Sequence, residues 1–209
     1  MLLFGHLGIT MGAAMAAQGT KQYFDVNSKR RITFPSPSES KDKLSIHRKR
    51  FSPVTITETL AKNIDIRFLL IGAILPDIID KPLGLFHIGS GRSISHTLLF
   101  LLIFALSGLI LYFVKKWKRM LVLAGGISAH LLLDSMWLNT HVLFWPFYGS
   151  QFSTGNPADW ISHWGTELTG DPIVLIFEST GFLIAAYFVY FLFKQRKLCA
   201  FLKDGYFKE

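Results

Sequence analysis

Two aspartates interrupt one of the most apolar stretches of the chain, LLIGAILPDIIDKP, at residues 69–82. A carboxylate near the centre of a bilayer costs about 2.5–3.5 kcal/mol on insertion scales, so two of them need a compensating partner. Asp77 and Asp80 are three positions apart, and a helix therefore projects both from one face. That face could bind a cation.

A second polar pair lies in the apolar stretch GGISAHLLLDSMW. His130 and Asp134 are four positions apart, so a helix places these two side chains on one face as well. Two such faces that meet can enclose a cation, because carboxylate oxygens and imidazole nitrogens suit Zn²⁺, Mn²⁺ or Fe. A site with several aspartates and two or three histidines could hold one or two ions.

Other polar residues in apolar surroundings could join this site or have simpler roles. His6 lies in the first apolar stretch, and Arg92 and His96 lie in GRSISHTLL. Glu178 either belongs to the site or extends its carboxylate to the membrane surface. The aspartates could instead be neutralised by Arg92 and Lys81 in a structural ion-pair cluster, and a lone histidine could be hydrogen-bonded packing.

The elements that must position these residues are membrane-spanning helices. The chain has 209 residues, is 50% hydrophobic and contains 19 Phe and 5 Trp, more than an ordinary soluble domain needs for one core. Segments near the length of a spanning helix cover residues 2–17, 95–114, 120–138 and 173–193, and an interrupted one covers roughly 67–86. The predicted fold is an all-α, polytopic membrane helix bundle of about five segments, one of them broken or re-entrant.

The first segment contains AMA, which is typical of a signal-peptide cleavage site, but it lacks a basic region before its apolar run. A retained helix is therefore favoured over a cleaved signal. Lys and Arg concentrate in 18–67, in 115–119 and after 193. The positive-inside rule makes these stretches cytoplasmic, with the N-terminus outside and the C-terminus cytoplasmic. This topology brings the histidines and aspartates into one outer layer of the membrane.

The net charge of +8 comes from basic residues at the ends of apolar segments, which favours a membrane orientation signal over nucleic-acid binding. Residues 18–66 are polar and basic, and they are predicted to form a flexible cytoplasmic loop within a single membrane-embedded domain covering 1–209. The alternative is a loop that binds a cytoplasmic protein partner. Cys199 is the only cysteine, which excludes intrachain disulfides and thiolate metal sites.

Five motifs in a fixed order carry a family resemblance: GHLGIT, LPDIID, GRSISHTLL, HLLLDSMW and FWPF. They resemble the inner-membrane-associated metal-dependent hydrolases, whose name in some members includes LexA binding. The motifs of that family are similar to those of the zinc-dependent phospholipase C and P1 nuclease group. The resemblance implies an all-helical site that hydrolyses phosphoesters, with metal ligands at His6, Asp77, Asp80, His96, His130 and Asp134.

The favoured hypothesis is a membrane-bound metal-dependent hydrolase that cleaves a phosphoester of a lipid-type substrate at the outer face of the bacterial cytoplasmic membrane. One or two divalent ions, zinc before manganese, would lower the pKa of a bound water. Arg92 would hold the phosphate, and Asp80 could act as general base instead of ligand.

The aromatic-rich stretch 141–168 would form an interfacial belt, a hydrophobic lip that admits a lipid chain, or both. Two other functions stay open. Intramembrane Asp and His residues also mark proton-linked or ion-linked transporters, although such proteins usually carry polar residues in both halves of the membrane. A regulatory membrane protein could use the metal structurally and bind a partner through its cytoplasmic loop.

Overall fold

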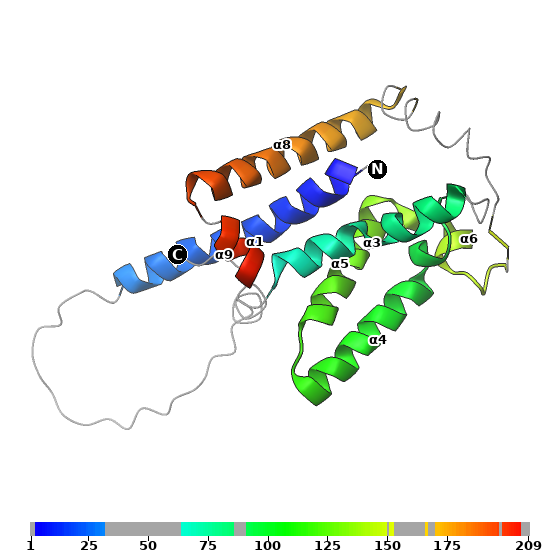
Figure 1. Ribbon diagram of the computed structural model, residues 1–209, viewed down its shortest axis with the longest axis horizontal. Coiled ribbons are helices and arrows are strands. Elements are labelled where there is room, and N and C mark those ends of the chain that lie inside the picture. Colours follow the sequence, from blue (N-terminus) through cyan, green and yellow to red (C-terminus); the bar gives the residue numbers. More distant parts are fainter. Residues whose placement is uncertain are drawn as a thin grey trace, which may run out of the picture. The chain divides into compact units, whose positions relative to one another are not determined.

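The structure is a computed structural model that describes residues 3–31, 64–85, 91–149, 151–152, 166, 170–196 and 198–205 (Figure 1). The regular elements in these residues are all helical, which confirms the predicted all-α class. They are α1 (Leu3–Arg31), α3 (Ile66–Leu85), η1 (Ile94–His96), α4 (Leu98–Lys115), α5 (Arg119–Leu133), η2 (Met136–Leu138), α6 (Thr140–Leu143), α8 (Pro172–Lys194) and α9 (Leu198–Asp204).

The chain divides into two compact units, one formed by residues 1–13 with 64–209 and the other by 14–63. The first unit contains all of the predicted site residues. In the second, α1 continues beyond the predicted end of the first segment, from residue 17 to Arg31. Residues 32–63 lie outside the described residues, so the flexible cytoplasmic loop at 18–66 stays a prediction. Its first residues, up to Arg31, are helical.

Membrane-spanning helices form the first unit. α4 and α8 are each long and apolar enough to cross a bilayer, and two shorter apolar helices cover Leu3–Ala17 and Arg119–Leu133. Side chains along α4 are largely exposed, as Phe113 (70%) and Val114 (73%) illustrate. Apolar exposure of this extent is expected where lipid replaces water as the solvent. The predicted polytopic helix bundle is confirmed.

The segment that was expected to be broken or re-entrant is one continuous helix, α3, although it contains Pro76 and Pro82. Proline removes a backbone donor, which leaves the carbonyl four residues earlier without its usual partner, and transmembrane helices tolerate such an interruption. The carbonyl of Pro76 itself makes a separate contact, because it accepts a hydrogen bond from Ser95 Oγ at 2.8 Å. This bond also ties η1 to the middle of α3.

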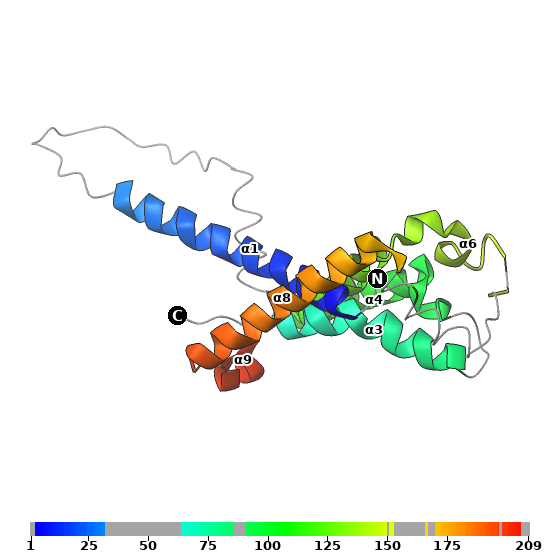
Figure 2. The ribbon, with the colours of Figure 1, turned by 90° about the horizontal axis from the view of Figure 1, so that it is seen from above.

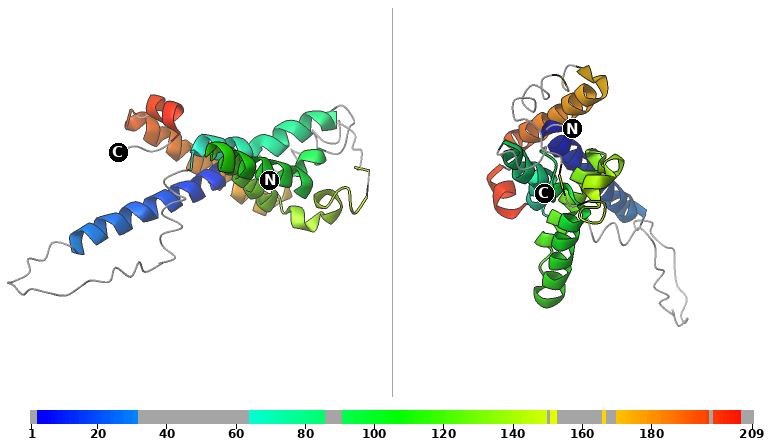
Figure 3. Two further views of the ribbon diagram at one scale, coloured as in Figure 1. Left: turned by 90° about the horizontal axis from the view of Figure 1, so that it is seen from below. Right: turned by 90° about the vertical axis from the view of Figure 1, so that its right-hand side faces the viewer.

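α3 and α5 pack backbone to backbone through two glycines. A Cβ on Gly126 would lie 2.2 Å from Leu69 O, and one on Gly72 would lie 2.2 Å from Leu123 O. Small residues allow helices to approach this closely in a membrane. The other side of α5 packs against α4, and the right-hand view of Figure 3 shows this green pair side by side.

α1 and α8 form a second close pair. A Cβ on Gly8 would lie 1.9 Å from Gly181 O, and the rings of Phe4 and Phe182 meet edge to face with centroids 5.2 Å apart. Figure 2 shows α8 crossing the first turns of α1. Gly8 and Gly12 make a G-x-x-x-G pattern that is typical of such contacts in membranes.

Glu178 lies at this crossing with only 6% of its surface exposed. Its Oε2 accepts a hydrogen bond from Phe4 N and its Oε1 accepts one from Gly5 N, both at 3.0 Å. The first N–H groups of a helix have no partner within the helix, and a carboxylate placed there also complements the helix dipole. Glu178 therefore caps α1, and its carboxylate is engaged within the protein.

α1 and α8 run in the same direction, and so do α3 and α5, since the contacting residue numbers increase together in each pair. The predicted topology has successive segments crossing the membrane in opposite directions. It therefore requires the first and fifth segments to be parallel, and likewise the second and fourth, as these pairs are. Which side of the membrane each end faces stays a prediction.

The glycine contact between α3 and α5 leads to the first prediction. Gly126→Ala should destabilise the protein by about 1–3 kcal/mol, because the added methyl must push two backbones apart. Thermal unfolding in detergent would measure this loss. Gly125→Ala is the matched control, since a Cβ there would meet only Leu69 Cδ1, at 3.9 Å. Equal unfolding temperatures for the two variants would contradict the close packing.

Candidate functional site

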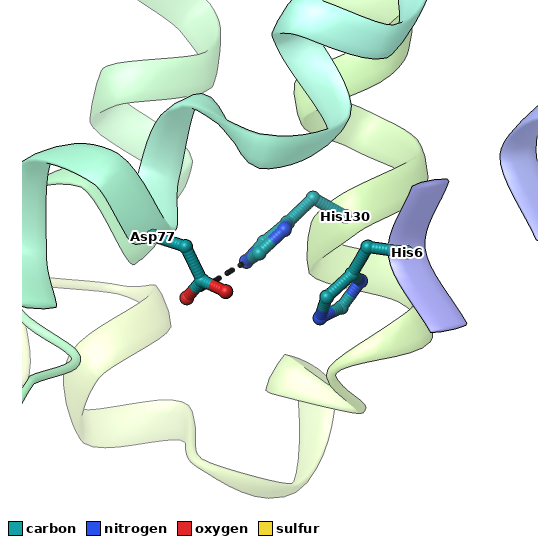
Figure 4. A group of neighbouring side chains, drawn as sticks. All are labelled: His6, Asp77 and His130. Carbon is teal, nitrogen blue, oxygen red and sulfur yellow. Dashed lines mark ion pairs between the residues drawn. The ribbon is translucent and has the colours of Figure 1, made fainter. Parts of the chain in front are cut away.

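Four elements converge on one buried cluster of histidine and aspartate side chains, part of which is drawn in Figure 4. The side chains of the cluster are between 0% and 10% exposed. The members are His6 from α1, Asp77 and Asp80 from α3, His96 from η1, and His130 with Asp134 from the end of α5. The structure thus brings together all six residues that the sequence suggested as metal ligands.

Asp80 lies behind His96 and fixes its ring. Its Oδ2 accepts hydrogen bonds from Ser93 N at 2.6 Å and Ser95 N at 3.2 Å, and it lies 2.8 Å from His96 Nδ1. A carboxylate with these donors accepts, so Nδ1 of His96 carries the proton. The other ring nitrogen of His96, Nε2, then presents a lone pair to the centre of the cluster.

His130 is fixed in the same way from α3. Its Nδ1 lies 2.7 Å from Ala73 O, and a carbonyl oxygen can only accept, so Nδ1 again carries the proton. His130 Nε2 faces His96 Nε2 at 3.2 Å. Two lone pairs that face each other at this distance repel. A cation between them, either a shared proton or a metal ion, removes the repulsion.

Asp77 completes a triangle with the two histidines. Its Oδ1 lies 3.7 Å from His96 Nε2 and 3.9 Å from His130 Nε2, and Figure 4 marks the second contact. Its Oδ2 contacts Lys81 Nζ at 2.5 Å, one helical turn further along α3. The three facing atoms therefore come from one carboxylate and two imidazoles, each held from behind by another group.

His6 lies against the ring of His130. The two rings stack with centroids 4.1 Å apart and an angle of 24° between their planes (Figure 4). Both ring nitrogens of His6 are buried and have no hydrogen-bond partner among the described residues. A buried imidazole without a partner is unusual, and each such group needs an explanation.

Asp134 pairs with the more exposed of the two cations that contact the cluster. Its Oδ2 accepts a hydrogen bond from Arg92 Nε at 2.7 Å, and the Arg92 side chain is 41% exposed. Its Oδ1 lies 3.4 Å from His6 Nε2. Of the ion pairs considered as an alternative for the aspartates of α3, the one between Lys81 and Asp77 forms, whereas Arg92 pairs with Asp134.

Two overlapping groups of residues could each hold an ion, because the nitrogen and oxygen atoms within each group lie within 4.8 Å of one another. The groups are His6, Asp77 and His130, and His96, His130 and Asp134. Asp80 belongs to neither group, since its oxygens face Ser93, Ser95 and His96. The structure places Asp80 where it orients His96, and its sequence-based roles as direct ligand or general base stay predictions.

Another histidine of the described residues, His141 in α6, lies apart from the cluster and contacts Tyr148 O through Nδ1 at 3.2 Å. His87 and His163 lie outside the described residues.

Comparison with known proteins adds a family to this geometry. The family described as YdjM inner membrane protein matches residues 42–202, most of the chain. The chain belongs to this family. No curated protein and no solved structure matches it. The predicted inner-membrane localisation is thereby supported, while the similarity to metal-dependent hydrolases, zinc phospholipase C and P1 nuclease stays a prediction.

Membership of the YdjM family gives the buried cluster a membrane setting. Lipid offers no hydrogen bonds, so polar groups among these helices must find their partners in the protein. Most of the cluster follows this rule through the contacts above. The exceptions are the ring nitrogens of His6, which make no hydrogen bond among the described residues, and the facing lone pairs of His96 and His130.

Sequence reasoning missed the groups that hold the cluster from behind. The backbone N–H groups of Ser93 and Ser95 and the carbonyl of Ala73 carry no side-chain signal. The cap formed by Glu178 needed the knowledge that α8 lies beside α1. The i, i+4 spacing of Asp77 and Lys81 was visible and was considered only as an alternative.

Exposed apolar side chains follow the cluster along the chain. Trp137, Leu138 and Phe147 are 53%, 79% and 87% exposed. Trp145 instead stacks on Phe152, with ring centroids 5.2 Å apart. α6 packs against η1, which brings this region close to the site. Trp160 and Trp164, also expected in the aromatic lip, lie outside the described residues.

Proposed function

We propose that the cluster binds one divalent metal ion, zinc before manganese, and that the protein hydrolyses phosphoesters of a lipid-type substrate. The observation that carries the proposal is the pair of Nε2 atoms of His96 and His130, which face each other at 3.2 Å while both Nδ1 atoms are engaged as donors. Paired imidazoles oriented by a carboxylate and a carbonyl are the usual arrangement of histidine metal ligands.

The distances of the triangle fit a zinc ion. A point equidistant from Asp77 Oδ1, His96 Nε2 and His130 Nε2 lies about 2.1 Å from each atom. Zn–N and Zn–O bonds are about 2.0–2.2 Å long. The donor set of nitrogen and oxygen atoms suits zinc and, less tightly, manganese.

A metal accounts for more of the site than a shared proton does. One proton between His96 and His130 would relieve the facing lone pairs but would give His6 no hydrogen bond, since its Nε2 has only the 3.4 Å contact with Asp134 Oδ1. With a metal, His6 would become a fourth ligand beside His130. Both candidate ligand groups use His130, whose Nδ1 is already engaged by Ala73 O, so they favour one ion over two.

A zinc ion bound here would supply Lewis acidity, which lowers the pKa of a coordinated water and polarises a phosphoryl oxygen. The protein groups beside the ion would do the rest. Asp134 would accept a proton from the attacking water as the water oxygen bonds to phosphorus. The P–O ester bond would then break, and Asp134 would give this proton to the leaving alkoxide. Asp80 would keep the His96 ring in place.

Arg92 would hold the substrate phosphate. Its guanidinium has five N–H donors, of which Nε–H bonds Asp134, and its side chain is partly exposed. A planar, permanently charged donor fork suits phosphate oxygens. The exposed apolar side chains of Trp137, Leu138 and Phe147, in the region that packs against η1 through α6, favour an ester with a lipid chain over a soluble one or a nucleic acid.

The metal is tested by its content in detergent-purified protein. Wild type should carry about one equivalent of zinc after reconstitution, and His130→Ala and Asp77→Ala should lose it, because each removes a corner of the triangle. His141→Ala is the matched control and should keep its zinc. Asp80→Asn should bind about 10–100-fold more weakly. Zinc-free wild type, or full occupancy in His130→Ala, would overturn the metal site.

Hydrolysis is tested with zinc-loaded protein on vesicles that contain phosphatidic acid, with phosphate release as the readout. Arg92→Ala should lower kcat/KM about 100-fold, since it removes the donors for the phosphate. Arg119→Ala removes an arginine from the opposite end of α5 and should leave the rate unchanged. Zinc-loaded wild type that cleaves neither phosphatidic acid nor an activated phosphodiester would contradict the hydrolase proposal but not the metal site.

A further inference from the structure

Glu178 is a buried carboxylate of α8 that belongs to no candidate metal group, yet it acts on the helix that carries His6. Its two oxygens accept hydrogen bonds from Phe4 N and Gly5 N, each at 3.0 Å. These donors immediately precede His6 in the chain. The carboxylate therefore contacts the backbone within one residue of a proposed ligand.

The position of His6 depends strongly on its backbone. Neither ring nitrogen has a hydrogen-bond partner among the described residues, so no hydrogen bond fixes the ring as Asp80 fixes His96. Stacking on His130 limits the tilt of the ring, and Asp134 Oδ1, which lies 3.4 Å from His6 Nε2 without forming a hydrogen bond, restrains its sliding only weakly. The height and rotation of the first turn of α1 must then place the ring.

We propose that Glu178 is a positioning residue that holds the first turn of α1 so that His6 reaches the metal site. Its effect on metal binding rests on the proposed function. The effect on His6 itself does not, because it follows from the two hydrogen bonds alone.

One further contact shows which motions of α1 Glu178 must restrict. The close approach of Gly8 and Gly181 fixes the distance between α1 and α8 one turn below the cap. This contact resists closer approach, but it does not prevent rotation or sliding of α1. A carboxylate that binds two successive N–H groups with two oxygens restricts both motions. A neutral acceptor such as Ser or Asn presents only one oxygen to these donors.

Asp171 offers a matched control on the same helix. It caps α8 itself, where its Oδ1 accepts a hydrogen bond from Ile173 N at 2.8 Å. Asp171→Ala thus removes a helix-capping carboxylate without touching α1. If Glu178 served only general stability, the two alanine variants would differ in unfolding temperature alone.

The first experiment measures zinc affinity by competition with a chelator in the detergent-purified protein. Glu178→Ala should weaken zinc binding about 10-fold. Glu178→Gln, which keeps one acceptor oxygen, should fall between this variant and wild type and should fold even if the alanine variant does not. Asp171→Ala should bind zinc as wild type does. Unchanged zinc affinity in both Glu178 variants would overturn the positioning role.

The second experiment needs no metal and therefore separates failure of the positioning role from failure of the proposed function. In a Cys199→Ser background, His6→Cys places a single thiol where the side chain is 1% exposed. N-ethylmaleimide, with a chelator present, should label it slowly. Adding Glu178→Gln should raise the labelling rate about tenfold by loosening the turn, whereas adding Asp171→Ala should not. Equal labelling rates in all three proteins would overturn the inference even if wild type binds zinc.

Discussion

The contact between His96 Nε2 and His130 Nε2 is the constraint on which the rest of the buried polar structure depends. The two atoms can stay 3.2 Å apart only if a cation separates their lone pairs. Each ring is prevented from turning away, His96 by Asp80 and His130 by the carbonyl of Ala73. The hydrogen bonds of the two Nδ1 atoms thus determine that both Nε2 atoms point into the site.

Helix packing supplies the precision that this contact needs. Ala73 O reaches His130 because α3 and α5 approach each other through Gly72 and Gly126. Ser95 Oγ holds η1 on α3 through the carbonyl of Pro76. The aspartates and the proline that make α3 look like a poor membrane helix are therefore the residues that attach its neighbours to it.

Buried charge is distributed in pairs around the cluster. Lys81 neutralises one oxygen of Asp77, Arg92 bonds Asp134, and Glu178 binds the positive end of α1. Each pairing lowers the cost of a carboxylate among membrane helices. After these pairings, the atoms that still face the centre of the site carry lone pairs, and the proposed metal ion would be bound by these atoms.

The sequence predicted the helical class, most of the segments and the residues of the cluster, because hydropathy and i, i+3 or i, i+4 spacing are local signals. It did not predict the division of labour within the cluster. Asp77 and Asp80 lie on one helix, but only the placement of η1 turns Asp80 toward the back of His96. The continuity of α3 and the cap by Glu178 likewise depend on contacts between distant segments.

The most direct test of the metal site is X-ray absorption at the zinc edge of the reconstituted wild-type protein. The account predicts a first shell of nitrogen and oxygen atoms at about 2.0–2.2 Å, with the outer-shell scattering of at least two imidazole rings. A shell of oxygen alone, or one that contains sulfur from Cys199, would contradict it.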